Sequence, residues 1–149
     1  MSNPAPPAIS LEIRNDVAEL AHVTHALDRL GKDAAIPEKA VTQLQVALDE
    51  VLSNIIKYAW PEGGAHELQV HIETRRDEIE AVITDDGVAF DPRGQPDAPS
   101  RGRPSRRGGL GLHMLRQLVD RIEYARIDGR NRVTLIKQYG ATSQRDEHR

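Results

Sequence analysis

The strongest constraint on the fold is a long helical stripe followed directly by two alternating segments. Between Pro37 and Trp60 the apolar residues recur at the 3.6-residue spacing of an α-helix with one buried face. Residues 68–72 and 79–83 then alternate between apolar and polar residues, which is the pattern of strands with one buried face. Helices and strands that each bury one face pack together in layers, so this order predicts an α/β fold.

The remaining segments extend the same arrangement. Strands are also predicted over 9–13, 122–127 and 133–139, and helices over 16–31 and 110–119. Asp16 and Glu19 have capping-box spacing at the start of the first helix, and we expect Gly31 to end it. Because neighbouring strands are mostly joined by tight turns, we expect a two-layer sandwich, in which three helices cover one face of a mixed, mostly antiparallel sheet.

The composition bounds the domain count and the partners. The 149 residues suit one soluble domain, expected over residues 9–140, and the net charge of −3 gives no reason to expect direct contact with nucleic acid. The absence of cysteine excludes disulfides and thiolate metal sites. No run approaches the roughly 18 apolar residues of a membrane span, and residues 1–8 do not resemble a signal peptide, so we expect a cytoplasmic protein.

Three regions are expected to be mobile or flexible. Residues 92–107 contain four prolines, two glycines and five arginines without an apolar period, so we predict a long loop there. A loop of this length inside a small domain is usually functional or disordered. The polar tail over 141–149 and the proline-rich start over 1–8 are expected to be flexible ends.

A polar stripe runs along one side of the predicted helix over 37–60. Glu50 and Asn54 are four residues apart and share a face, and Lys57 lies about one turn further on the same side. Most stripes of this kind are solvated faces with an i,i+4 pair. The alternative is that the amide oxygen of Asn54 binds a metal ion while the carboxylate of Glu50 acts as a base.

The predicted strand over 79–83 ends in an acid. Asp85 has the parity of the buried residues before it, and a buried acid needs a partner. Its carboxylate can accept a hydrogen bond from the exocyclic amine of adenine, whereas guanine presents an oxygen at that place. Gly87 allows the backbone to approach a flat base closely. The alternative is an ordinary turn, because Asp and Gly are common turn residues.

A glycine-rich segment precedes the predicted helix over 110–119. Gly109, Leu110 and Gly111 stand at its N-terminus, where free backbone N–H groups can hold phosphate oxygens. The segment is not a P-loop, because no Gly-Lys-Ser/Thr follows. It also differs from a dinucleotide-binding fingerprint, since Met114 stands where the third glycine belongs. The alternative is a flexible hinge for the preceding loop.

Together these segments resemble the GHKL superfamily of ATP-binding domains, over about residues 9–139. Glu50 to Asn54 resembles its N box, Asp85-x-Gly87 its adenine box, and Gly109-Leu110-Gly111 the end of its glycine-rich lid. The run from Asn131 to Thr134 resembles the late strand whose threonine supports the adenine site. The chain departs from the family at Ala89, where a second glycine is common, and at Tyr58, where many relatives carry histidine.

Within the superfamily the chain is similar to the bacterial serine-protein kinases that act as anti-sigma factors, on the runs Ala47–Asn54 and Phe90–Pro92. This resemblance implies an ATP and Mg²⁺ site. Glu50 is then the base, Asn54 holds the metal, and residues 92–107 form a mobile ATP lid. The nucleotide contacts are expected from Asn54, Lys57, Asp85, Gly87, Arg107, Gly109, Leu110, Gly111 and Thr134.

The same resemblance implies the partners. Such kinases phosphorylate a serine of a small anti-sigma factor antagonist and sequester a sigma factor, usually as homodimers, in a cycle called partner switching. Two alternatives require the same pocket. One is a nucleotide-dependent binding module without phosphotransfer, and the other is an ATPase in which Glu50 activates water.

Overall fold

The computed structural model describes residues 7–93 and 111–140. In these ranges the chain forms β1 (Ala8–Arg14), a short 3₁₀ turn (Val17–Glu19), α1 (Leu20–Asp33), α2 (Glu38–Tyr58), β2 (Glu67–Thr74), β3 (Glu78–Asp85), α3 (Gly111–Leu118), β4 (Arg121–Ile127) and β5 (Arg130–Gln138). The predicted strands and helices are all present. Most of the predicted lid, part of the N-terminal end and the C-terminal tail lie outside the described residues.

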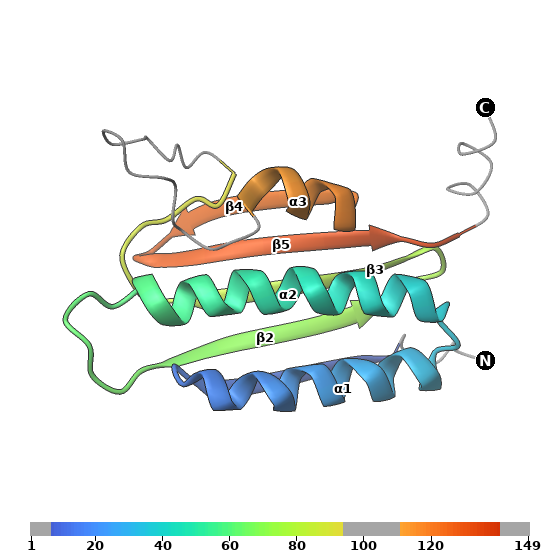
Figure 1. The fold of residues 1–149 in the computed structure, drawn as a ribbon, viewed down its shortest axis with the longest axis horizontal. Helices are drawn as coiled ribbons and strands as arrows, with labels where there is room; N and C mark the ends of the chain where they lie inside the picture. The colour runs from blue at the N-terminus through green and yellow to red at the C-terminus, as the bar shows by residue number, and fades with distance from the viewer. Residues whose placement is uncertain (1–6, 94–110, 141–149) are drawn as a thin grey trace.

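The sheet has five strands in the order β1-β2-β3-β5-β4, and α1, α2 and α3 lie on one of its faces (Figure 1). The predicted two-layer α/β sandwich is therefore confirmed. The expected mixture of strand directions is corrected, because all four described pairings are antiparallel. β3 and β4 do run in the same direction on either side of α3, but β5 lies between them and separates the two.

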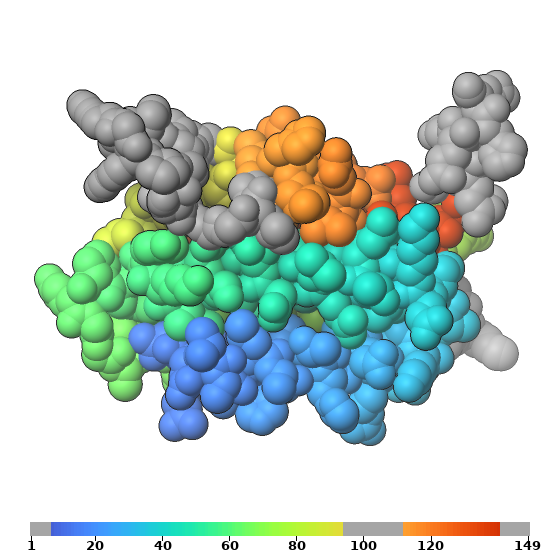
Figure 2. Space-filling view, viewed as in Figure 1, coloured from blue at the N-terminus to red at the C-terminus, as the bar shows by residue number. Residues whose placement is uncertain are grey.

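The core lies between the sheet and the helices. On β3 the residues Ile79, Ala81 and Ile83 have no exposed surface and face α2, as their alternation predicts. α2 supplies its apolar stripe to the same core, with Leu44 and Leu48 at most 2% exposed. Figure 2 shows α2 crossing the middle of the helical face between α1 and α3. α2 is therefore the central helix of the layer that covers the sheet.

The start and end of α1 differ in detail from the prediction. Asp16 accepts a hydrogen bond from the backbone N–H of Ala18 and so caps the short 3₁₀ turn that leads into the helix. Gly31 does not end α1, which continues to Asp33. Its role is close packing, because a Cβ at this position would lie 2.6 Å from Cγ2 of Val41 on α2.

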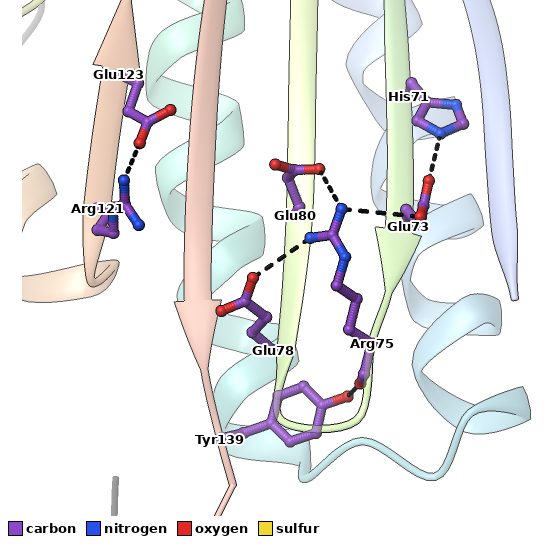
Figure 3. A network of polar contacts seen from close by, with 8 residues as sticks. All are labelled: His71, Glu73, Arg75, Glu78, Glu80, Arg121, Glu123 and Tyr139. Carbon is purple, nitrogen blue, oxygen red and sulfur yellow. Dashed lines mark hydrogen bonds and ion pairs between the residues drawn. The ribbon is translucent and has the colours of Figure 1, made fainter. Parts of the chain in front are cut away.

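The other face of the sheet carries none of the described helices and is lined with charged side chains (Figure 3). The guanidinium of Arg75 lies 3.1 Å from Glu80, 3.3 Å from Glu78 and 3.8 Å from Glu73. These carboxylates raise the pKa of Arg75, with Glu80 contributing most. No helix in the described part of the chain combines the length and apolarity needed to cross a membrane.

Candidate active site

An open hollow lies beside the C-terminal half of α2. Its walls come from α2, from the segment after β3, from α3 and from the start of β5. The lining residues are Val51, Asn54, Ile55, Tyr58, Ala59, Asp85, Val88, Phe90, Pro92, Leu115, Asn131 and Val133. A mostly apolar wall with a few converging polar groups is the usual character of a small-molecule site.

Asn54 and Glu50 form a pair on α2 at the edge of this hollow. The Nδ2 of Asn54 donates a hydrogen bond of 3.2 Å to Oε2 of Glu50, because four residues separate them and place them on one side of the helix. That bond turns the amide so that its oxygen points away from Glu50. The Oδ1 of Asn54 is buried and has no hydrogen-bond partner within the described residues. A buried acceptor without a partner is costly, so a cationic or donor ligand is the natural complement.

A magnesium ion fits this donor. Mg²⁺ prefers oxygen ligands, keeps several waters, and is commonly held by one or two protein groups together with substrate phosphates. Residues 7–93 and 111–140 contain no cluster of three or more histidines or carboxylates that could hold a metal without a substrate. Asn54 therefore suits a metal that arrives together with phosphate oxygens.

Glu50 and Lys57 lie at different distances from the hollow. Glu50 is half-buried and is not among the lining residues, but its carboxylate accepts the hydrogen bond from Asn54, which is one of them. Lys57 is exposed on the next turn and is not among the lining residues. The structure thus brings Glu50, but not Lys57, to the edge of the site.

Asp85 ends β3 on the covered face and is 2% exposed. Its Oδ1 accepts hydrogen bonds from the backbone N–H of Gly87 at 2.8 Å and from Nδ2 of Asn131 at 3.1 Å. Its Oδ2 has no hydrogen-bond partner in the described part of the chain, and the residue lines the hollow. Burial raises the pKa of Asp85, and the bonds from Asn131 and Gly87 oppose that rise.

Gly87 is required by packing against the end of α2. A Cβ on this residue would lie 2.4 Å from Cβ of Ala59 and 2.5 Å from its carbonyl oxygen. The next residue, Val88, donates its N–H to the same carbonyl at 2.8 Å. The glycine therefore lets the segment after β3 lie directly on α2, which forms the end wall of the hollow.

Thr134 is not brought to the site. It pairs with Val82 across β3 and β5, and both lie on the open face of the sheet, whereas Asp85 pairs with Asn131 on the covered face. Asn131 therefore takes the place beside Asp85 that the sequence comparison gave to Thr134. Asn131 is two residues before the buried Val133, so strand alternation places it on the covered face. The same alternation from Ile83 predicts that Asp85 lies on this face.

The glycine-rich segment is described only from its last residue. Gly111 begins α3 one turn before Leu115, which lines the hollow, so this helix starts on the same side as the site. Arg107, Gly109 and Leu110 lie outside the described residues. Their predicted contacts with phosphate stay predictions.

Comparison with known proteins agrees with this arrangement. The model of the family described as "Histidine kinase-like ATPase domain" matches residues 13–137. The crystal structure of the RsbU and RsbW domains of a Mycobacterium tuberculosis protein is similar to this chain at a TM-score of 0.64 and 15% identity. The similarity covers 89% of this chain and 32% of that chain, and it shows the shared fold.

Curated relatives are named as kinases. The serine/threonine-protein kinase BtrW of Bordetella bronchiseptica is 35% identical over 62% of this chain and 66% of its own length. The serine-protein kinase RsbW of Halalkalibacterium halodurans is 29% identical over 56% of this chain and 54% of its own. RsbW of Bacillus subtilis is 24% identical over 72% of this chain and 69% of its own. The match thus spans between about half and two thirds of these relatives, and the chain belongs to the histidine kinase-like ATPase domain family.

Proposed function

We propose that this protein is an ATP-dependent serine-protein kinase of the partner-switching type. It binds Mg-ATP in the hollow beside α2, transfers the terminal phosphoryl group to a serine of a small antagonist protein, and sequesters a sigma factor. The observation that carries the proposal is that Asn54, hydrogen-bonded to Glu50, and the buried Asp85 line one hollow. The names of the relatives support the reaction class, and the partners follow from the resemblance to the anti-sigma factor kinases.

The hollow suits a purine base. Ile55, Val88 and Phe90 give it apolar walls on which a flat ring can pack, and Asp85 supplies an acceptor among them. In this proposal Oδ2 of Asp85, which has no hydrogen-bond partner among the described residues, accepts a hydrogen bond from the exocyclic amine of adenine. Guanine carries an oxygen at that position, and two facing acceptors repel each other. We therefore assign Asp85 the selection of adenine.

The phosphate end of the ligand lies toward Asn54 and α3 in this proposal. The orphaned Oδ1 of Asn54 holds the magnesium ion, which neutralises charge on the phosphate oxygens. We also propose that the backbone N–H groups of the run Gly109-Leu110-Gly111 hold phosphate oxygens and that Arg107 assists them. Lys57 is exposed, so we assign it no contact with the bound nucleotide.

Glu50 is the proposed base. In the transfer its carboxylate takes the proton of the substrate serine hydroxyl while the serine oxygen bonds to phosphorus and ADP leaves. The hydrogen bond from Asn54 holds this carboxylate at the edge of the hollow. Asp49, the neighbouring acid, is exposed and is rotated by about 100° around the helix.

The test is incubation of the purified protein with Mg-ATP labelled in its terminal phosphate and with a small antagonist protein encoded beside its gene. The proposal predicts label on a serine of the antagonist. Release of free phosphate alone would make the protein an ATPase. Nucleotide binding without either product would make it a binding module. Light scattering on the same samples tests a separate part of the proposal, the formation of a homodimer.

A further inference from the structure

Asn131 is the most fully engaged polar side chain near the hollow. It lies at the start of β5 and is only 2% exposed. Its Nδ2 donates to Oδ1 of Asp85 at 3.1 Å and to the backbone carbonyl of Val88 at 2.8 Å. Both N–H groups of the amide are therefore used by the segment that carries the proposed base-reading acid.

The oxygen of the same amide faces three donors. Its Oδ1 accepts from the hydroxyl of Tyr124 at 2.5 Å, from Nη1 of Arg126 at 3.1 Å and from the backbone N–H of Phe90 at 3.3 Å. Arg126 also donates to the carbonyl of Gly87 at 2.8 Å. Two strands and the segment after β3 thus meet at one amide.

These partners allow only one orientation of the amide. A guanidinium and a backbone N–H can only donate, and a backbone carbonyl can only accept. If the amide were flipped, its NH₂ group would face Arg126 and the N–H of Phe90, and its oxygen would face the carbonyl of Val88. Asn131 is therefore obliged to present an N–H group to Asp85.

We propose that Asn131 is a positioning residue that sets base selectivity through Asp85. Its N–H, with that of Gly87, fills Oδ1 of Asp85 and leaves Oδ2 as the oxygen of this carboxylate that can accept from a base in the hollow. Asn131 has no polar atom to spare for the ligand, so it acts through the acid and not by direct contact. This inference rests on the proposed function, because it assumes that the hollow receives a purine.

The same hydrogen bond favours the ionised acid. Burial raises the pKa of Asp85, and the hydrogen bond from Asn131 opposes that rise. Of the charges that face the carboxylate, Asp86 raises its pKa and Arg126 lowers it. Tyr58 of α2 lines the same hollow. Without the donor, Asp85 takes up a proton at a higher pH, and a protonated carboxyl presents an O–H group that suits guanine.

The test compares ATP and GTP affinity, across pH, for the wild type, Asn131→Asp and Tyr124→Phe. Asn131→Asp keeps the size and the acceptor edge but replaces the donor edge by an oxygen. It is expected to bind ATP about tenfold or more weakly than the wild type and to have a smaller ratio of ATP to GTP affinity. When the pH is lowered, its ATP binding should be lost at a higher pH than in the wild type. Tyr124→Phe leaves Arg126 and Phe90 to orient the amide, so its ratio stays within about twofold.

Asn131→Ala, which adds no charge, is the second variant if Asn131→Asp fails to fold, and it is expected to reduce the ratio in the same direction. This inference alone is overturned if the wild type prefers ATP and a folded Asn131 variant keeps both the wild-type ratio of ATP to GTP affinity and the wild-type pH profile. A wild type that binds both nucleotides equally, or neither, overturns the assignment of Asp85 to adenine together with it.

Discussion

The two faces of β3 carry acids in opposite circumstances. Asp85 lies on the covered face, is 2% exposed, and has burial raising its pKa. Glu78 and Glu80 lie on the open face, where both are half-exposed and share the guanidinium of Arg75 (Figure 3). The strand alternates between a face that packs on helices and a face that meets water, so neighbouring positions place the same chemical group in different surroundings.

From this contrast we expect Asp85 to serve the site and Glu78 and Glu80 to play no part in it. A carboxylate in water gains little from a neighbouring arginine, because solvent screens the pair. A buried carboxylate is costly, so a buried acid that lines a hollow is a candidate for a functional role. The following predictions test this expectation by changing residues at the site and acids or their ion-pair partner on the open face.

The largest effect is expected at Glu50. Glu50→Gln keeps the size and the hydrogen bond to Asn54 but cannot take a proton, so phosphotransfer to the antagonist serine should fall by about 10²–10⁴-fold. ATP affinity should stay within a few fold. Asp49→Asn and Glu80→Gln are the matched controls, and initial rates with labelled ATP measure all three. A wild-type rate in Glu50→Gln would exclude Glu50 as the base.

A smaller loss is expected when Asp85 is removed. Asp85→Ala deletes the acceptor that faces the hollow, and a hydrogen bond to a charged group contributes roughly 1.5–3 kcal/mol, or about ten- to a hundredfold in affinity. Calorimetry with ATP measures the loss, and Glu78→Ala on the open face is the control. Unchanged ATP affinity in folded Asp85→Ala would remove the acid from the site.

Gly87→Ala tests the contact between the segment after β3 and α2. The added Cβ would lie 2.4 Å from Ala59, so either the segment or the helix end must move. Overpacking of this kind typically costs about 1–3 kcal/mol of unfolding free energy. Chemical denaturation measures the cost, and Ala89→Gly, at the exposed neighbouring position, is the comparison variant. Equal stability of Gly87→Ala and the wild type would show that this wall yields freely.

The dependence of stability on pH tests the burial of Asp85. Burial raises its folded-state pKa, so the folded protein binds this proton more readily than the unfolded chain. The stability cost of the buried charge is present above the folded pKa and disappears as pH falls through it. Asp85→Asn keeps the acceptor for Gly87 and Asn131 without the charge, and should melt at a higher temperature near pH 7. That advantage should vanish below about pH 4, the unfolded value.

The smallest effect is expected on the open face. Arg75→Ala removes a guanidinium that three carboxylates share, yet exposed ion pairs contribute about 0–1 kcal/mol each. The unfolding free energy should fall by about 1 kcal/mol or less, and phosphotransfer should not change. A loss above about 3 kcal/mol would mean that this face is buried against a partner in solution.

Local patterns were enough to predict the layers and the positions of several candidate site residues. Period and parity placed α2 and β3, and with them Glu50, Asn54 and Asp85. Thr134 was misplaced, because a motif match ignored that one residue along a strand changes the face. The contact between Gly87 and Ala59 joins residues far apart in the sequence, so only the packed structure reveals it.

The most direct test of the central claim is calorimetric titration of the wild-type protein with ATP and with GTP, each with magnesium and with EDTA. Oδ2 of Asp85 and the orphaned Oδ1 of Asn54 predict tight binding of Mg-ATP, much weaker binding of Mg-GTP, and a marked loss of ATP affinity in EDTA. Equal affinity for the two nucleotides, or an ATP affinity that EDTA leaves unchanged, would contradict this account of the hollow.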